Sequence, residues 1–216
     1  MLRLTLARHA STEWNEAGRY QGWSDPPLSG KGRREAERLC ARLAGETFDR
    51  VFASDLLRAR ETAEIAAPGV PVETDRRLRE LHFGAWEGLT WDECAARDGD
   101  LPRRWAADPA SVAPPDGETA AEFEARVAGA LDDLPTEGSV LVVSHAGTLH
   151  AVLARWLGVT LRQTFALRIS ACGLTRAEVF PDGVRVLCVN DTTHMTAGDG
   201  AAPAGPVALP AAERVR

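Results

Sequence analysis

Two histidines of this chain each stand directly after a short apolar stretch and directly before small residues. His9 follows the stretch 2–8, and His145 follows the stretch 139–144. A neutral imidazole attacks electrophiles well near pH 7. Ligands of open α/β sheets bind beyond the carboxyl ends of the strands, so two histidines placed there can face each other across one pocket. The pattern indicates nucleophilic chemistry carried by histidine.

Arginines accompany these histidines. Arg8 directly precedes His9, and Arg58 follows another apolar stretch, 51–53. Arg58 falls in the first turn of a predicted helix for which Ser54 and Asp55 are the expected caps. It would lie near the positive end of the helix dipole, and a guanidinium group can bind two phosphate oxygens at once. Two arginines at one pocket favour a phosphate ester as the ligand.

The segment 8–15, Arg-His-Ala-Ser-Thr-Glu-Trp-Asn, resembles the signature of the histidine phosphatase superfamily, in the branch that includes cofactor-dependent phosphoglycerate mutases. The family pattern is Arg-His-Gly-x-Thr-x-x-Asn, so the chain departs from it at Ala10. An alanine is a small change there unless the backbone needs a positive φ. Further stretches resemble the family's motifs in the same order: 18–23, 54–63, 78–88, 117–127 and 143–147, the last with Ala146 for the usual glycine.

The resemblance implies a role for each matching residue. His9 would be the nucleophile, and Glu80 would protonate the leaving oxygen and then activate water. The neighbouring cations are expected to keep His9 neutral in the empty site. Two arginines and a second histidine can neutralise a phosphate, so no metal or other cofactor is expected. The predicted phosphate-binding groups are Arg8, Arg58, His145, Asn15, Gln21, Gly22 and the backbone amide of Ala146.

Other charged residues are interpreted as structural or solvated. Glu13 and Glu87 are rivals for the role of proton donor, and the resemblance selects Glu80 instead. The arginines within 33–38, with Glu35 between them, are interpreted as a solvated helix face.

Three functions fit these residues. A phosphatase passes the phosphoryl group to water, a phosphoglycerate mutase passes it to another phosphorylated acid, and a non-catalytic relative only binds phosphate. The segment 81–138 holds four arginines and no lysine, and 83–88 resembles the phosphatase members of the family. We expect a metal-independent phosphomonoesterase that acts on a small phosphorylated metabolite, with the mutase and the phosphate-binding protein as alternatives.

The elements that position these residues alternate along the chain. Apolar runs and alternation predict strands over 2–6, 51–53, 70–74 and 139–143, and a hairpin of 174–180 with 184–189. Helical spacing predicts helices over 31–43, 56–67, 119–134 and 147–158, with short helical patterns around Trp91 and Trp105. This order predicts a three-layer α/β/α sandwich on a mostly parallel sheet, as the resemblance to phosphoglycerate mutases also implies. The stretch 78–115 is expected to cover the site.

Length and charge bound the remaining choices. The 216 residues suffice for one α/β domain, predicted as 1–195, before an Ala/Pro/Gly-rich tail, 196–216, that is expected to lack fixed structure. The net charge of -6 argues against nucleic-acid and membrane partners, and leaves a small phosphate ester as the expected ligand. A homodimer stays open.

The cysteines and the apolar segments indicate the compartment. With no long apolar segment and no signal peptide, we expect a cytoplasmic protein. The cysteines have no metal-binding spacing and are predicted to be buried free thiols: Cys40, Cys94, Cys172 and Cys188.

Overall fold

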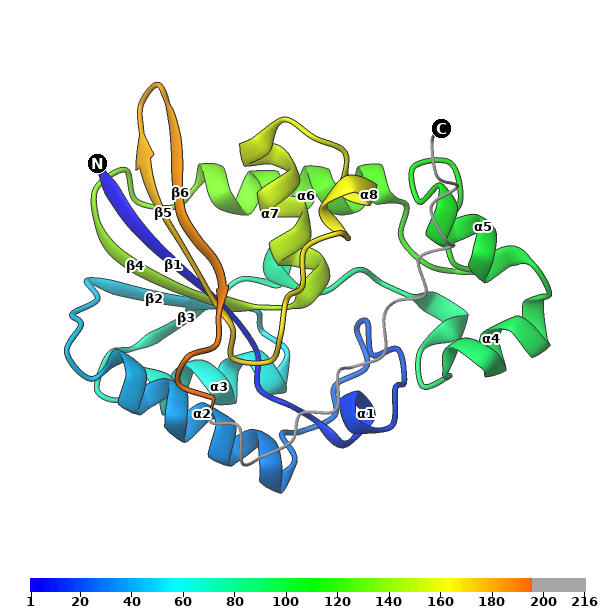
Figure 1. Ribbon diagram of the computed structural model, residues 1–216, viewed down its shortest axis with the longest axis horizontal. Helices are drawn as coiled ribbons and strands as arrows, with labels where there is room; N and C mark the ends of the chain where they lie inside the picture. Colours follow the sequence, from blue (N-terminus) through cyan, green and yellow to red (C-terminus); the bar gives the residue numbers. More distant parts are fainter. Residues whose placement is uncertain (196–216) are drawn as a thin grey trace.

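Six strands form the central sheet: β1 (Leu2–Arg8), β2 (Arg50–Ala53), β3 (Val72–Thr74), β4 (Gly138–Ser144), β5 (Leu174–Phe180) and β6 (Gly183–Asp191). The computed structural model describes residues 1–195, and the predicted tail lies outside the described residues. The strand order is β3-β2-β4-β1-β5-β6 (Figure 1). The first four strands of this order run parallel, and β5 and β6 form an antiparallel hairpin at one edge. The predicted mostly parallel sheet and the predicted hairpin are confirmed.

Neighbouring strands end at the same level, which brings the residues after them together. β1 pairs with β4 so that Arg8 lies opposite Ser144, and the His9 amide donates to the Ser144 carbonyl at 2.8 Å. His9 and His145 therefore leave the sheet side by side. On the other side of β4, the Ser54 amide continues the β2 ladder with a 3.0 Å bond to the Val143 carbonyl. The chain that leads to Arg58 therefore also starts at the carboxyl ends of the strands.

Helices cover both faces of the sheet (Figure 1). The helices of the described residues are α1 (Glu13–Glu16), α2 (Gly30–Leu43), α3 (Leu57–Ala66), η1 (Arg76–Leu78), η2 (Gly84–Trp86), α4 (Trp91–Asp98), α5 (Leu101–Ala107), α6 (Ala120–Asp132), α7 (Ala146–Leu157) and α8 (Leu161–Thr164). Leu39 of α2 and Ala63 of α3 belong to the apolar core on one face, and Phe123 of α6 and Leu149 of α7 belong to the core on the other. The predicted three-layer α/β/α sandwich is confirmed.

The stretch between η1 and α6 extends away from the sheet. It carries α4 and α5, which lie on the side of the molecule toward which β1 and β4 run (Figure 1). Its packing is aromatic: Trp86 is fully buried and meets Trp105 edge to face, with 5.8 Å between ring centroids. The helical patterns predicted around Trp91 and Trp105 are confirmed as α4 and α5.

The start of α3 differs from the prediction. Its N-cap residue is Leu56, which makes no side-chain capping bond. Asp55 instead forms a two-bond ion pair with Arg79, with both distances at 2.7 Å, and the Ser54 hydroxyl accepts from the Leu56 amide. The free amide of Leu57 is bound by the carboxylate of Asp25, 2.7 Å away. A distant loop therefore caps this helix, because the local acid is taken by an arginine.

Other local features also depart from the prediction. The one-turn helices α1 and α8 are absent from the predicted elements, although a capping box opens each of them, with Thr12 and Asn15 in α1 and Thr160 and Gln163 in α8. Strand β3 begins at Val72, two residues later than predicted.

The prediction of four buried thiols is half right. All four cysteines are free. Cys94 and Cys172 are buried, whereas Cys40 and Cys188 are half-buried, because they lie on outer positions of α2 and of the edge strand β6.

Candidate active site

His9 and His145 meet beyond the ends of β1 and β4. Their ring centroids are 5.0 Å apart in an edge-to-face arrangement, and both side chains are buried. His9 Nδ1 lies 2.7 Å from the carbonyl oxygen of Ala10. Because a carbonyl only accepts hydrogen bonds, Nδ1 carries the proton, and Nε2 is left with the free lone pair that a nucleophile needs. Burial and, after it, the charges of Arg58 and Arg8 hold the pKa of His9 well below 6.5, so the ring is neutral.

His145 offers two ring nitrogens without a partner. Both Nδ1 and Nε2 are buried and have no hydrogen-bond partner among the described residues. Buried polar atoms are rarely left without a hydrogen-bond partner. Two such ring nitrogens beyond the carboxyl end of β4 therefore indicate a place for a ligand. Burial, and then the charge of Arg58, the neighbouring titratable ring of His9 and the charge of Arg8, lower the pKa of His145 well below 6.5. An arriving phosphate dianion would offset these cations and favour a protonated, hydrogen-bond-donating His145.

Arg8 and Arg58 are anchored through carbonyl groups and not through carboxylates. Arg8 Nη1 donates to the Ile169 carbonyl at 2.8 Å, and Arg58 donates to the carbonyls of Ser24 and Gly22, each at 2.8 Å. The Nε atoms of both arginines are buried without a partner among the described residues. Burial lowers the pKa of Arg58 to about 10. Both guanidinium groups therefore keep a charge that no ion pair within residues 1–195 neutralises, as a phosphate-binding site requires.

A half-buried acid, Glu87, holds the loop that anchors Arg58. Glu87 accepts from the amides of Trp23, Ser24 and Phe83, at 2.9, 2.7 and 3.2 Å. Gly22 has a φ of +52°, and a Cβ there would lie 2.1 Å from a Glu87 oxygen, so this position requires glycine. The structural interpretation of Glu87 is confirmed.

Glu80 faces the start of α7. Its Oε2 accepts from the Gly147 amide at 3.0 Å, and its Oε1 accepts from the Leu81 amide at 2.9 Å. The carboxylate raises the pKa of Arg8 and of Arg58, against the lowering by burial, which places it within electrostatic reach of both. A Cβ at position 147 would lie 2.1 Å from Glu80 Oε1, so glycine is needed for this approach.

Three further predicted site residues lie close by in supporting positions. Asn15 Oδ1 closes the capping box of α1 by accepting from Thr12, which leaves the Nδ2 amide as the donor that the box does not use. The buried Gln21 accepts from the Thr12 hydroxyl at 3.0 Å. The amide of Ala146 is the first of α7, where free amides point out of the helix. Direct contact of these groups with phosphate stays a prediction.

The departure from the family pattern at position 10 costs little. Ala10 is absent from the residues with positive φ, so its backbone does not demand glycine. Its amide donates to the Thr62 hydroxyl at 3.0 Å, and Thr62 donates in turn to the Arg58 carbonyl. Thr62 thus links the His9 loop to α3.

The interpretation of Glu35 as a solvated residue is wrong. Its side chain is buried, and its Oε2 accepts from the Ser11 amide at 2.8 Å. Lys31 lies 3.9 Å from its other oxygen. Charged neighbours in the sequence suggested a wet helix face, but the loop after His9 folds over this side of α2.

We expect the free energy of unfolding to decrease as the pH drops below about 6.5, the ordinary pKa of histidine. His9, His145 and His150 all have lowered pKa values, that of His150 to about 4, mainly because of burial. Near pH 6.5 these histidines bind protons in the unfolded chain but not in the folded protein, so acid favours unfolding. Each ring contributes a loss of about 1.4 kcal/mol between pH 7.5 and 5.5.

Urea unfolding at the two pH values tests this, with His150→Phe as the matched variant. His150 packs edge-on against Phe165 at 5.3 Å, so the apolar ring suits its surroundings. The variant should lose about 1.4 kcal/mol less than the wild type over the same interval. An equal loss in both proteins would show that His150 is not held neutral.

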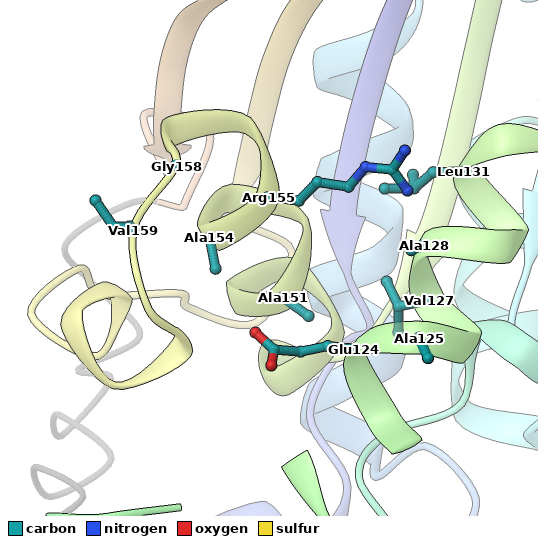
Figure 2. Close-up of a pocket in the computed structure, with 10 residues that line it drawn as sticks. All are labelled: Glu124, Ala125, Val127, Ala128, Leu131, Ala151, Ala154, Arg155, Gly158 and Val159. Carbon is teal, nitrogen blue, oxygen red and sulfur yellow. The ribbon is translucent and has the colours of Figure 1, made fainter. Parts of the chain in front are cut away.

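The remaining surface adds a shallow hollow between α6 and α7. It is lined mainly by small apolar side chains, with Glu124 and Arg155 at its edges, and by none of the predicted site residues (Figure 2). Within residues 1–195, no three His, Cys, Asp or Glu side chains are grouped closely enough to bind a metal ion. No helix in the same part of the chain has the length and apolarity needed to cross a membrane.

Comparison with known proteins agrees with this geometry. The model of the histidine phosphatase superfamily (branch 1) matches residues 4–192. A protein of Serratia proteamaculans named "Probable phosphoglycerate mutase GpmB" is 34% identical over 205 residues, covering 90% of this chain and 95% of that protein. The alpha-ribazole phosphatase from Shigella flexneri is 27% identical with a TM-score of 0.80, covering 88% of this chain and 96% of that one. The phosphoserine phosphatase from Entamoeba histolytica is also 27% identical with a TM-score of 0.80, covering 91% and 100%.

Proposed function

Because the chain belongs to the histidine phosphatase superfamily (branch 1), we propose that it is a metal-independent phosphomonoesterase acting on a small phosphorylated metabolite through phosphohistidine on His9. One observation carries the proposal: the bond from His9 Nδ1 to the Ala10 carbonyl leaves Nε2 unprotonated beside two arginines whose Nε atoms have no partner in the described part of the chain. A phosphatase with a histidine nucleophile needs both features.

In the first step, His9 Nε2 attacks phosphorus and the bond from phosphorus to the ester oxygen breaks. Arg8, Arg58 and His145 stabilise the charge on the phosphoryl oxygens. The protonated Glu80 carboxyl gives its proton to the leaving oxygen, which departs as an alcohol. The products are phosphohistidine, the free alcohol and a Glu80 carboxylate.

In the second step, water attacks the phosphorus of phosphohistidine. The Glu80 carboxylate takes a proton from this water, the bond from phosphorus to Nε2 breaks, and inorganic phosphate leaves. Neutral His9 and protonated Glu80 are restored. The amides of Gly147 and Leu81, which hold the Glu80 carboxylate in place, support its role as base in this step.

The mutase alternative differs only in the acceptor of the phosphoryl group. The name of the Serratia relative favours it, whereas the structural neighbours named above are phosphatases. Two of the four arginines in 81–138 already have backbone partners: Arg97 binds the Ala85 carbonyl, and Arg126 binds carbonyls near Glu80. This leaves few cations in the segment for the carboxylate of a phosphoglycerate, and it supports transfer to water.

A partition experiment separates the alternatives. The purified protein is given 3-phosphoglycerate with a trace of 2,3-bisphosphoglycerate, or a panel of phosphorylated metabolites, always with EDTA. We expect release of inorganic phosphate from at least one ester at an undiminished rate in EDTA, and no formation of 2-phosphoglycerate. Interconversion of the phosphoglycerates without phosphate release would establish the mutase, and loss of activity in EDTA would exclude the metal-free mechanism.

A further inference from the structure

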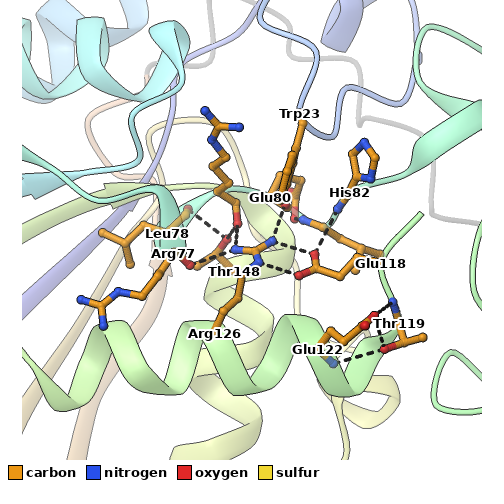
Figure 3. Close-up of polar contacts among 12 residues, drawn as sticks. Trp23, Arg77, Leu78, Glu80, His82, Glu118, Thr119, Glu122, Arg126 and Thr148 are labelled. Carbon is orange, nitrogen blue, oxygen red and sulfur yellow. Dashed lines mark hydrogen bonds and ion pairs between the residues drawn. The ribbon is translucent and has the colours of Figure 1, made fainter. Parts of the chain in front are cut away.

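Arg126 of α6 uses its whole guanidinium group on Glu118 and on the backbone of the segment that carries Glu80 (Figure 3). Nη1 donates to the carbonyls of Arg77 and Arg79 at 2.8 and 2.7 Å, and Nη2 donates to the carbonyl of Glu80 at 2.7 Å. Nε and Nη2 also donate to the two oxygens of Glu118, at 2.6 and 2.8 Å. These are five bonds, and a guanidinium group has five N–H donors. Arg126 has none left for a substrate.

The segment needs such support because it lies outside the sheet. Among the described residues, 79–83 pair with no strand, and the carbonyls of Arg79 and Glu80 are bound by side chains. Thr148 of α7 donates to the Arg79 carbonyl at 3.0 Å, and Trp23 Nε1 donates to the Glu80 carbonyl at 3.0 Å. Arg126 binds two of these carbonyls, those of Arg79 and Glu80, together with the Arg77 carbonyl just before them.

Glu118 holds the backbone on the other side of Glu80, at His82. Its carboxylate, paired with Arg126, also accepts from the His82 amide, and its own amide donates to the His82 carbonyl at 2.9 Å. The backbone is thus held on both sides of residue 80 by one ion pair that is largely shielded from water, with side chains 16% and 11% exposed. The carboxylate of Glu80 takes no part in these contacts and points to the Gly147 amide.

We propose that Arg126 is a positioning residue that sets the reach of the Glu80 carboxyl to the leaving oxygen. The inference rests on the proposed function, in which Glu80 is the proton donor. It predicts that loss of Arg126 slows the hydrolysis of an ester more strongly when the leaving oxygen of that ester must be protonated. Misplacing a catalytic group by a small distance costs up to about 100-fold in rate. Binding of the phosphate, which depends on other residues, should change little.

The test compares two substrates in Arg126→Met. One is an alkyl phosphate that the wild type hydrolyses, whose leaving oxygen must be protonated, and the other is 4-nitrophenyl phosphate, whose leaving group departs as an anion. We expect kcat/KM, which reports the first step and not the hydrolysis of phosphohistidine that both esters share, to fall about 10-fold to 100-fold for the alkyl ester and less than about 3-fold for the nitrophenyl ester. KM for the alkyl ester should stay within about 2-fold, since uniform binding is not altered.

Two comparisons make the result decisive. Arg155→Met removes an exposed ion pair with Asp132, on the neighbouring helix, and should leave the ratio of the two rates unchanged. Thr148→Val removes one bond to the same segment and should shift the ratio in the same direction by about 3-fold, so the idea remains testable if Arg126→Met does not fold.

Glu80→Gln separates failure of this inference from failure of the proposed function. If Glu80→Gln slows the alkyl ester selectively and Arg126→Met slows both esters equally, Arg126 is only structural and the inference is overturned. If Glu80→Gln lowers kcat/KM equally for both esters, Glu80 is not the proton donor. The proposed mechanism is then overturned together with the inference.

Discussion

Replacing His9 with alanine is expected to stop turnover and to abolish the covalent phosphoprotein. The Nδ1 of His9 is bound to a backbone carbonyl, which leaves Nε2 as the attacking atom. Alanine has no nucleophilic atom, so the rate should fall by on the order of 10⁴-fold or more. Rapid mixing with ³²P-labelled ester and a denaturing alkaline quench should trap an acid-labile label on the wild type and none on His9→Ala.

His150→Phe is the matched control for this experiment, because it removes another partly buried imidazole that has no role in the proposed chemistry. It should retain both the label and the turnover. A labelled His9→Ala protein, or one that still turns over, would show that another group takes the phosphoryl group. Unfolding curves for both variants would show that the loss of activity is not a loss of the fold.

Replacing Arg58 with methionine is expected to lower kcat/KM on the order of 10³-fold, because one fixed cation no longer faces the phosphoryl oxygens. Methionine fills much of the space of this fully buried side chain. The pH profile should change as well. After burial, the charge of Arg58 is the main cause of the lowered pKa of His9. Without that charge the pKa of His9 rises, so the acid limb of kcat/KM should move to higher pH.

The direction of this movement is the discriminating observation. A purely structural defect would lower kcat/KM at every pH and leave the acid limb in place, which would contradict the proposed electrostatic role of Arg58. Arg50→Met serves as the control. Arg50 belongs to β2, the strand that leads toward Arg58, but lies at its other end and pairs with Glu73 on the surface. Its loss should alter neither the rate nor the acid limb.

The sequence alone was sufficient for the parts of the protein that depend on local pattern. The alternation in 2–6 and the apolar run 139–143 predicted the two strands, and parallel pairing then required His9 and His145 to emerge at one edge. The motifs also indicated Arg58 and Glu80 as members of the site. Such features are readable because strand and helix periodicity, and the order of motifs, are properties of neighbouring residues.

Features that depend on contacts between distant segments came only from the tertiary structure. No local pattern shows that Asp25 caps α3, that Glu35 is buried, or that Asp55 prefers Arg79 to its own helix. The same is true of Arg126, which is 46 residues from Glu80 in the chain yet binds its carbonyl.

The physical reason is the same in each case. A charged side chain goes to the strongest set of partners that the fold brings within reach, and partners separated by tens of residues meet only after the layers have packed. The sequence therefore indicated the candidate residues for the chemistry, through motif and period. The packed fold decided which groups hold those residues in place.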